Sequence, residues 1–205
     1  ESIRPSFSDE NKKSRDILYV NGLLPNKQIL HVFVCHLPSR YGGVRASEKF
    51  RRQVAGQLRA RVDSLFSEEP HALILIMGDF NDEPCDLSLS RDLGARNPQE
   101  PYRPASLYNM MWPLMGKPSY GSHKYQGSWL MIDQIIVSSA LLYEEPLQQG
   151  SPPVRRLSGG EVRFDDFLLV KDEKYLGYKP FRTYEAYRYT GGYSDHLPVC
   201  LDIPF

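Results

Sequence analysis

A continuous apolar run that ends in a polar loop does most to limit the folds open to this chain. The run His71–Met77 is too short to span a membrane, and its apolar residues are not separated by polar ones. Such a run is typical of a strand that is buried on both faces of a sheet. It leads directly into Gly78, Asp79, Phe80 and Asn81, so the strand is predicted to deliver polar side chains at its end.

Three further apolar segments carry polar residues in the same way. We predict strands over Ile29–Cys35, which delivers His36, over Leu130–Val137, which carries Asp133 in its middle, and over Leu197–Ile203, which follows Asp195 and His196. A lone carboxylate in surroundings as apolar as those of Asp133 is costly unless it is paired or bound to metal. We therefore expect a protonated histidine beside Asp133.

The spacing within the first polar loop suggests a shared site. Asp79 and Asn81 are two positions apart, and side chains alternate between the faces of a strand. Both side chains therefore point the same way if the strand geometry persists through Gly78.

The segment between the first two strands has the pattern of an amphipathic helix. Over Arg45–Phe66, apolar residues recur at spacings of three and four, namely Phe50, Val54, Leu58, Val62 and Leu65. A strand, a helix and a strand in succession indicate a βαβ unit with a right-handed crossover. The fold class predicted from this order is α/β.

The same helix carries many basic side chains, for which there are two interpretations. They are Arg45, Lys49, Arg51, Arg52, Arg59 and Arg61. They could form a nucleic-acid-binding face, or they could simply be the solvated side of the helix. Because Glu48 and Asp63 interrupt the cluster, the second interpretation is favoured.

Four motifs, taken in order along the chain, resemble those of the endonuclease/exonuclease/phosphatase superfamily. They are HLPS at 36–39, GDFN at 78–81, IDQI at 132–135 and SDHLPV at 194–199. The resemblance runs from about Arg15 to the C-terminus. It implies a two-sheet α/β sandwich of the DNase I-like type and hydrolysis of phosphoester bonds with Mg²⁺, or with Mn²⁺ in its place.

The resemblance also implies roles for individual residues. His36, Asp79, Asn81, Asp133 and His196 would be catalytic, Asp195 would bind the metal, and Asn81 and Arg15 would contact phosphate. His196 would accept a proton from the attacking water, with Asp79 helping to orient that water. His36, backed by Asp133, would protonate the leaving alkoxide. For Arg15, an exposed position at the start of a strand is an equally good interpretation.

Each of these residues also has a simpler interpretation on its own. His36 could be a structural histidine, Asp79 and Asn81 a turn, and Asp195 the entry to a strand. The order and context of the motifs together favour a phosphoesterase site. His31, His71 and His123 have no comparable context, and the sequence gives them no role.

The resemblance also implies a further N-terminal half, which supplies an asparagine and a metal-binding glutamate that have no counterpart here. We therefore expect residues 1–205 to be a single domain that lacks its N-terminal part. The alternative function is that of a catalytically silent fragment, which folds or binds only with the missing half or with a second copy. Exposed sheet edges would favour such self-association.

Composition leaves the substrate open. The chain has 25 basic and 25 acidic residues among 205, so it offers nucleic acid no overall attraction. Nucleic acid, a phosphoinositide and other phosphodiesters remain as substrates, and neither a transmembrane run nor a localisation is indicated. Residues 171–193 are rich in tyrosine and basic residues, and they could stack on bases or pack down as a loop. The second interpretation is favoured.

Overall fold

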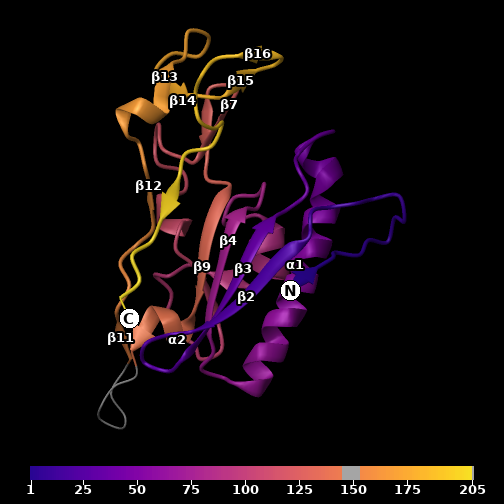
Figure 1. Cartoon of the computed structure of the whole chain (residues 1–205), viewed down its shortest axis with the longest axis vertical. Coiled ribbons are helices and arrows are strands. Elements are labelled where there is room, and N and C mark those ends of the chain that lie inside the picture. Colours follow the sequence, from indigo (N-terminus) through magenta and orange to yellow (C-terminus); the bar gives the residue numbers. More distant parts are fainter. Residues whose placement is uncertain (145–152, 205) are drawn as a thin grey trace.

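A seven-stranded mixed sheet forms the centre of the molecule (Figure 1). The structure is a computed structural model that describes residues 1–144 and 153–204. The strand order is β1-β2-β3-β4-β9-β6-β5, in which β3 pairs with β4 and β5 with β6 in parallel while the other neighbours are antiparallel. This mixed α/β architecture confirms the predicted fold class.

The central strands and the helices have the following bounds. The sheet contains β1 (Ser2–Ile3), β2 (Ile17–Leu23), β3 (Ile29–His36), β4 (Leu73–Asp79), β5 (Ala95–Arg96), β6 (Leu107–Asn109) and β9 (Asp133–Ser138). The helical segments are α1 (Val44–Glu68), α2 (Ser139–Leu142), the π-helical turn η1 (Ser88–Asp92), and the 3₁₀ turns η2 (Trp112–Leu114) and η3 (Asp166–Leu168).

Five two-stranded ladders accompany the central sheet among the described residues. They are β7 (His123–Tyr125) with β8 (Ser128–Leu130), β10 (Tyr143–Glu144) with β11 (Val154–Arg155), β12 (Glu161–Val162) with β17 (Val199–Cys200), β13 (Leu169–Lys171) with β14 (Tyr178–Pro180), and β15 (Tyr184–Glu185) with β16 (Arg188–Tyr189). The described residues thus contain one extended sheet with short ladders, and they do not include a second extended sheet of the kind expected for a sandwich.

Strand β4 is buried because both faces of the sheet are covered. Ile74 and Ile76 contact a cluster that contains α1, whereas Leu75 and Met77 contact side chains on the opposite face. Figure 1 shows α1 on one side of the sheet and the C-terminal segments on the other. The unbroken apolar run of this strand follows from this burial on two faces.

Two of the predicted strands differ from what the structure contains. The strand expected over Leu197–Ile203 is reduced to Val199–Cys200, because only β12 pairs with it. Leu197 and Leu201 still pack into the core. The apolar pattern of this segment therefore arises from burial of its side chains and not from strand pairing along its whole length. The strand expected over Leu130–Val137 is divided into β8 and β9, and Asp133 is the first residue of β9 and not a mid-strand residue.

The tyrosines of residues 171–193 are mostly exposed. Exposed side chains in this segment include Tyr175, Tyr178, Tyr184, Tyr187, Tyr189 and Tyr193. The favoured interpretation, in which they pack down, is therefore wrong for most of them. The short ladders β13–β14 and β15–β16, to which several of them belong, lie at the top of the view in Figure 1.

Arg51 departs from the expectation that the basic residues of α1 face solvent. Its side chain is 0% exposed, and its Nε lies 2.7 Å from Oδ1 of Asp82, which is 1% exposed. The other nitrogens donate to Ser47 Oγ and to the Val44 carbonyl oxygen. Arg52 and Arg59 pair with carboxylates at the helix surface, in agreement with the favoured interpretation for those residues.

Gly78 is required by the close approach of β3 and β4. Its φ is +132°, and a Cβ at this position would lie 2.0 Å from the carbonyl oxygen of Cys35. No side chain fits in that space, and the conformation itself favours glycine. The residue therefore allows β4 to run next to β3 up to Asp79.

No helix in the described ranges is long and apolar enough to cross a lipid bilayer.

We expect the Arg51–Asp82 pair to behave as a buried ion pair in a double-mutant cycle. Arg51→Met or Asp82→Leu alone leaves one charge buried without a partner and should lower the free energy of unfolding by about 3–5 kcal/mol. The double variant should lose much less, because both charges are then absent. Urea denaturation measures the free energy of unfolding of all four proteins. If the loss in the double variant equals the sum of the losses in the two single variants, the pairing is contradicted.

One face of β2 and β3 presents exposed apolar side chains. Leu18 is paired in register with Val34, and Val20 with Val32. Leu18, Val20 and Val34 are all exposed, and the side chains of α1 pack against the other face of the sheet. Exposed apolar patches of this kind mark sites of association.

We expect this face to support self-association that depends on protein concentration. Sedimentation velocity should detect species larger than a monomer as concentration rises, and Val20→Lys with Val34→Lys should remove them. Leu176→Lys, at an exposed residue outside the patch, is the matched control and should have no effect. A monomer at every concentration would contradict the prediction.

Candidate active site

Three polar side chains form one row across adjacent strand ends. In register, His36 of β3 is paired with Asp79 of β4, and Asp79 is paired with Asp133 of β9. Directly opposite residues have their side chains on the same face of a sheet, with Cβ atoms about 4.5–5.5 Å apart. The sheet therefore brings together three of the residues that the sequence predicts.

Asp79 and Asn81 meet through a turn and not through a continued strand. β4 ends at Asp79, and Asn81 has a φ of +51°, a left-handed conformation that asparagine tolerates. The Asn81 backbone N–H donates to Asp79 Oδ1 at 2.8 Å, and Asn81 Nδ2 donates to Asp79 Oδ2 at 3.1 Å. The two residues share a site as expected, but an Asx turn is the physical reason.

His196 joins the row from a distant part of the sequence. Its Nδ1 lies 2.7 Å from Asp133 Oδ2, and its Nε2 lies 4.0 Å from Asp79 Oδ2. The side chain is largely buried in this arrangement. Asp133 is therefore held against His196, and the expectation of a histidine beside this carboxylate is correct.

The expected pairing of Asp133 with His36 is wrong. Strand β4 lies between β3 and β9, so Asp79 separates these two side chains. His36 instead has its Nε2 3.4 Å from Asp79 Oδ2. The row thus contains two histidine–carboxylate pairs, His36 with Asp79 and His196 with Asp133.

The two pairs differ in their protonation. Burial lowers the pKa of His36, and the charge of Asp79 offsets this only in part. Burial also opposes the charged form of His196, but the hydrogen bond and charge of Asp133 outweigh it and raise the pKa of His196 above its usual value. Burial and the neighbouring Asp133 raise the pKa of Asp79. Environments that separate two pKa values in this way are typical of acid–base sites.

His123 is a member of this cluster that the sequence interpretation missed. Its ring lies 4.5 Å from that of His196 between centroids, and the backbones of the two residues form an isolated antiparallel bridge. Its Nδ1 lies 3.0 Å from the carbonyl oxygen of Asp195. Burial lowers the pKa of His123, as does the charge of His196. No local motif identifies His123, because its partners Asp195 and His196 lie 72 and 73 positions further along the chain.

Asp195 and Arg15 lie at the margins of the cluster. Asp195 is exposed, and its carboxylate comes within 4.8 Å of ligand atoms of His123 and His196. Arg15 is also exposed, and it is near enough for its charge to lower the pKa of His36. The structure gives Arg15 no hydrogen bond or ion pair among the described residues.

The donor atoms fit a divalent cation that keeps part of its water shell. Asp79, Asp133 and His196 form one group with ligand atoms within 4.8 Å of one another, and His123, Asp195 and His196 form another. Mg²⁺ prefers oxygen ligands and usually takes one or two carboxylates from the protein. The carboxylates meet that requirement, whereas the group with two imidazoles also suits softer divalent ions.

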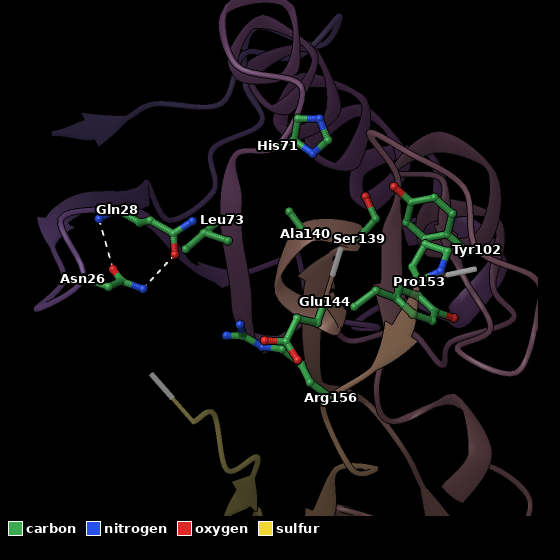
Figure 2. A pocket seen from close by; sticks show the side chains of 11 residues that line it. Asn26, Gln28, His71, Leu73, Tyr102, Ser139, Ala140, Glu144, Pro153 and Arg156 are labelled. Atoms are coloured by element: carbon green, nitrogen blue, oxygen red, sulfur yellow. Dashed lines mark hydrogen bonds between the residues drawn. The ribbon is translucent and has the colours of Figure 1, made fainter. Parts of the chain in front are cut away.

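Two pockets of comparable size lie at different places in the fold. One, of about 570 Å³, is drawn in Figure 2 and is lined by residues that include Asn26, Leu73 and Arg156. Leu73 is the first residue of β4, whereas Asp79 is the last, so this pocket lies at the end of the sheet opposite the cluster. The other, of about 630 Å³, is lined by Asn81 and His123 and adjoins the cluster.

We expect Asp133→Asn to lower the pKa of His196, because the variant removes the charge that stabilises the imidazolium. NMR titration should find the pKa of His196 raised from its ordinary value in the unchanged protein and lower in the variant. Asp165→Asn, which removes a carboxylate that is paired with Arg163 outside the cluster, should leave the pKa of His196 unchanged.

The same variant should change how stability depends on pH. A histidine whose pKa is raised by folding stabilises the folded state most at pH values below its unfolded pKa, and this contribution is lost as pH rises through the folded pKa. The loss of stability in Asp133→Asn should therefore be larger at pH 5.5 than at pH 8.5. Denaturation at both pH values tests this, and an equal loss would show that the raised pKa has another origin.

The sequence matches the model of the Endonuclease/Exonuclease/phosphatase family over residues 1–204. A comparison with curated proteins gave no match.

Several solved structures share the fold at low sequence identity. A D. rerio TDP2 humanized by 14 mutations has 22% identity and a TM-score of 0.51, and the match covers 97% of this chain and 64% of that one. D. rerio TDP2 complexed with a single-strand DNA product has 21% identity and a TM-score of 0.50, with coverages of 97% and 64%. A conserved protein of unknown function from Enterococcus faecalis V583 has 14% identity and a TM-score of 0.53, with coverages of 98% and 60%. The chain thus spans less than two thirds of each of these structures.

Proposed function

The chain belongs to the endonuclease/exonuclease/phosphatase family, and we propose that it hydrolyses phosphoester bonds with a divalent cation and two histidine–carboxylate pairs. The observation that carries this proposal is the row formed by His36, Asp79, Asp133 and His196. Four ionisable groups from three strands and a distant loop meet at one end of the sheet. Folding a protein around such a cluster is costly, which favours a function for it.

His196 is suited to be the general base in this proposal. Its Nδ1 is held by Asp133 at 2.7 Å, which fixes the ring and stabilises the imidazolium that forms when Nε2 accepts a proton from water. Asp79, whose Oδ2 lies 4.0 Å from that Nε2, is placed to orient the same water. His123 packs against the ring of His196 and limits its motion.

His36 takes the role of proton donor to the leaving oxygen. Its lowered pKa makes it neutral near pH 7, and the negative charge of a bound phosphate would favour its protonated form. Asp79, and not Asp133, is the carboxylate that accompanies this step.

Asn81 is proposed both to position Asp79 and to contact the phosphate. Both amide hydrogens of its side chain are engaged, one by Asp79 Oδ2 and one by the Leu37 carbonyl oxygen, each at 3.1 Å. Contact with a phosphate oxygen requires one of these bonds to be exchanged. Arg15 is free to approach the phosphate from the exposed side.

The cation is proposed to be Mg²⁺, with Mn²⁺ as a substitute, held by Asp195 and by the carboxylates of the row. When bound, it supplies positive charge to the phosphate oxygens. We also propose that the whole protein has the two-sheet sandwich of its family, of which the central sheet is one layer.

A nucleic acid is the substrate that the surface supports best. The exposed tyrosines of residues 171–193 offer rings for base stacking, and Lys174, Arg182 and Arg188 lie among them. The structure of D. rerio TDP2 with a single-strand DNA product adds support by similarity of fold. A phosphoinositide and other phosphodiesters are the alternatives.

A second candidate function follows from the length of the chain. The chain spans 64% of the D. rerio TDP2 structures, and the family resemblance implies a metal-binding glutamate outside the four motifs found in this sequence. A catalytically silent fragment, which binds only with a further segment or a second copy, is therefore the alternative.

We expect hydrolysis of bis(4-nitrophenyl) phosphate that requires Mg²⁺ and stops with a chelator. His196→Ala should reduce kcat by about 10²–10⁴-fold, the usual contribution of a general base. His71→Ala, which changes a histidine at the opposite end of β4, is the control for mutation and for contaminating enzymes. Activity should rise as pH increases through the raised pKa of His196, and Asp133→Asn should move this rise to lower pH.

Loss of activity in His71→Ala equal to that in His196→Ala would contradict the assigned site. No turnover by the unchanged chain with either Mg²⁺ or Mn²⁺ would instead support the silent fragment.

A further inference from the structure

The pocket that adjoins the cluster is lined by three separate segments of the chain. Its volume is about 630 Å³, within the range of small-molecule sites. The lining residues come from 39–44, from Asn81 and from the segment that runs from His123 to Ile132. Asn81 and His123 belong to the site described above, so a group in this pocket can be part of the molecule whose phosphate occupies that site.

The walls of the pocket are largely apolar and aromatic. Tyr41 is 94% exposed and Tyr125 is 59% exposed, although both line the same cavity. Val44, Leu130 and Ile132 add aliphatic surface. Exposed rings beside an apolar cavity favour a flat ligand that can stack on them.

The pocket offers no unpaired ionic group to a ligand. Arg40 is the only permanently charged residue in the lining, and its Nη2 lies 3.2 Å from Asp86 Oδ2 and 3.7 Å from Asp82 Oδ1. Its Nε donates to the carbonyl oxygen of Asn81 at 2.6 Å. The bound group should therefore be uncharged.

One wall presents polar backbone instead of side chains. Gly42 and Gly43 have φ values of +83° and +108°, and an added Cβ at either would meet nothing within 4 Å. Gly43 is the N-cap of α1, no side chain caps this end, and the first turn has no acidic residue. The N–H groups of the first turn can therefore donate to carbonyl oxygens or ring nitrogens at the edge of a ligand.

We propose that this pocket binds the nucleobase of the nucleotide whose phosphate occupies the candidate site. A nucleobase is flat, uncharged and aromatic on its faces, and it has hydrogen-bond acceptors at its edge. These properties match the tyrosine rings, the paired Arg40 and the uncapped helix. The proposal rests on the proposed phosphoesterase function and adds to it a preference for nucleoside esters.

The test compares two esters that have the same leaving group. Thymidine 5′-(4-nitrophenyl phosphate) contains a base, and methyl 4-nitrophenyl phosphate does not. The unchanged protein should hydrolyse the thymidine ester with a kcat/KM at least tenfold higher, mainly through a lower KM. Octyl 4-nitrophenyl phosphate controls for simple apolar binding, and equal rates for the octyl and thymidine esters would overturn the proposal.

Val44→Trp is the variant that fills the pocket. It should raise KM for the thymidine ester about tenfold and leave the methyl ester unchanged. Val20→Trp is the matched control, because Val20 and Val44 are 48% and 47% exposed and Val20 lies on β2 outside the pocket. Tyr125→Ala should act in the same direction as Val44→Trp if that variant folds poorly, and thermal unfolding monitors folding. Unchanged selectivity in both folded pocket variants would overturn the proposal.

A binding measurement separates this proposal from the proposed function. Thymidine 5′-monophosphate should shift the amide NMR resonances of Val44 and Leu130 in the unchanged protein, and Val44→Trp should abolish these shifts. If neither ester is hydrolysed but these shifts are seen, the pocket is supported and the catalytic proposal fails. If these resonances do not shift, the nucleobase proposal fails whatever the catalytic result.

Discussion

The buried ion pair between Arg51 and Asp82 connects the fold of this protein to its candidate site. Asp82 directly follows Asn81, so the carboxylate that anchors the loop after β4 adjoins the residue that holds Asp79. Arg51 belongs to α1, and its remaining donors are used within the first turns of that helix. A charge without a partner at this depth would be strongly unfavourable, so the ion pair holds the helix against the loop. Arg40 reinforces this position from the loop that precedes α1.

The parts of the fold that were predictable are those in which one local pattern decides the outcome. The apolar run before Asp79 and the periodicity of α1 both gave elements within a few residues of their bounds. Arg51 was misplaced because it was classified by charge. Arg51 lies three residues before Val54 and seven before Leu58, which places it on the buried stripe of the helix. Its place in the helical repeat therefore predicted burial correctly, whereas its charge did not.

The site was predictable as a set of residues but not as a set of pairs. Sequence motifs identified His36, Asp79, Asp133 and His196, whereas the partner of each depends on strand order. Because β4 lies between β3 and β9, Asp79 is the neighbour of His36 and Asp133 is left for His196. His123 has no motif and enters through a bridge to a residue far along the chain. The exposure of the tyrosines in residues 171–193 likewise depends on short ladders that have little pattern of their own.

The long sequence separation between Asp133 and His196 has a consequence for how the protein acquires its site. The two residues are 63 positions apart, so a long loop must close before the 2.7 Å contact can form. Contacts of such high sequence separation carry a large loop-closure entropy and tend to form late in folding. The central sheet can therefore form while His196 is still without its partner carboxylate. The acid–base pair that the proposed chemistry needs is completed only when this distant segment docks.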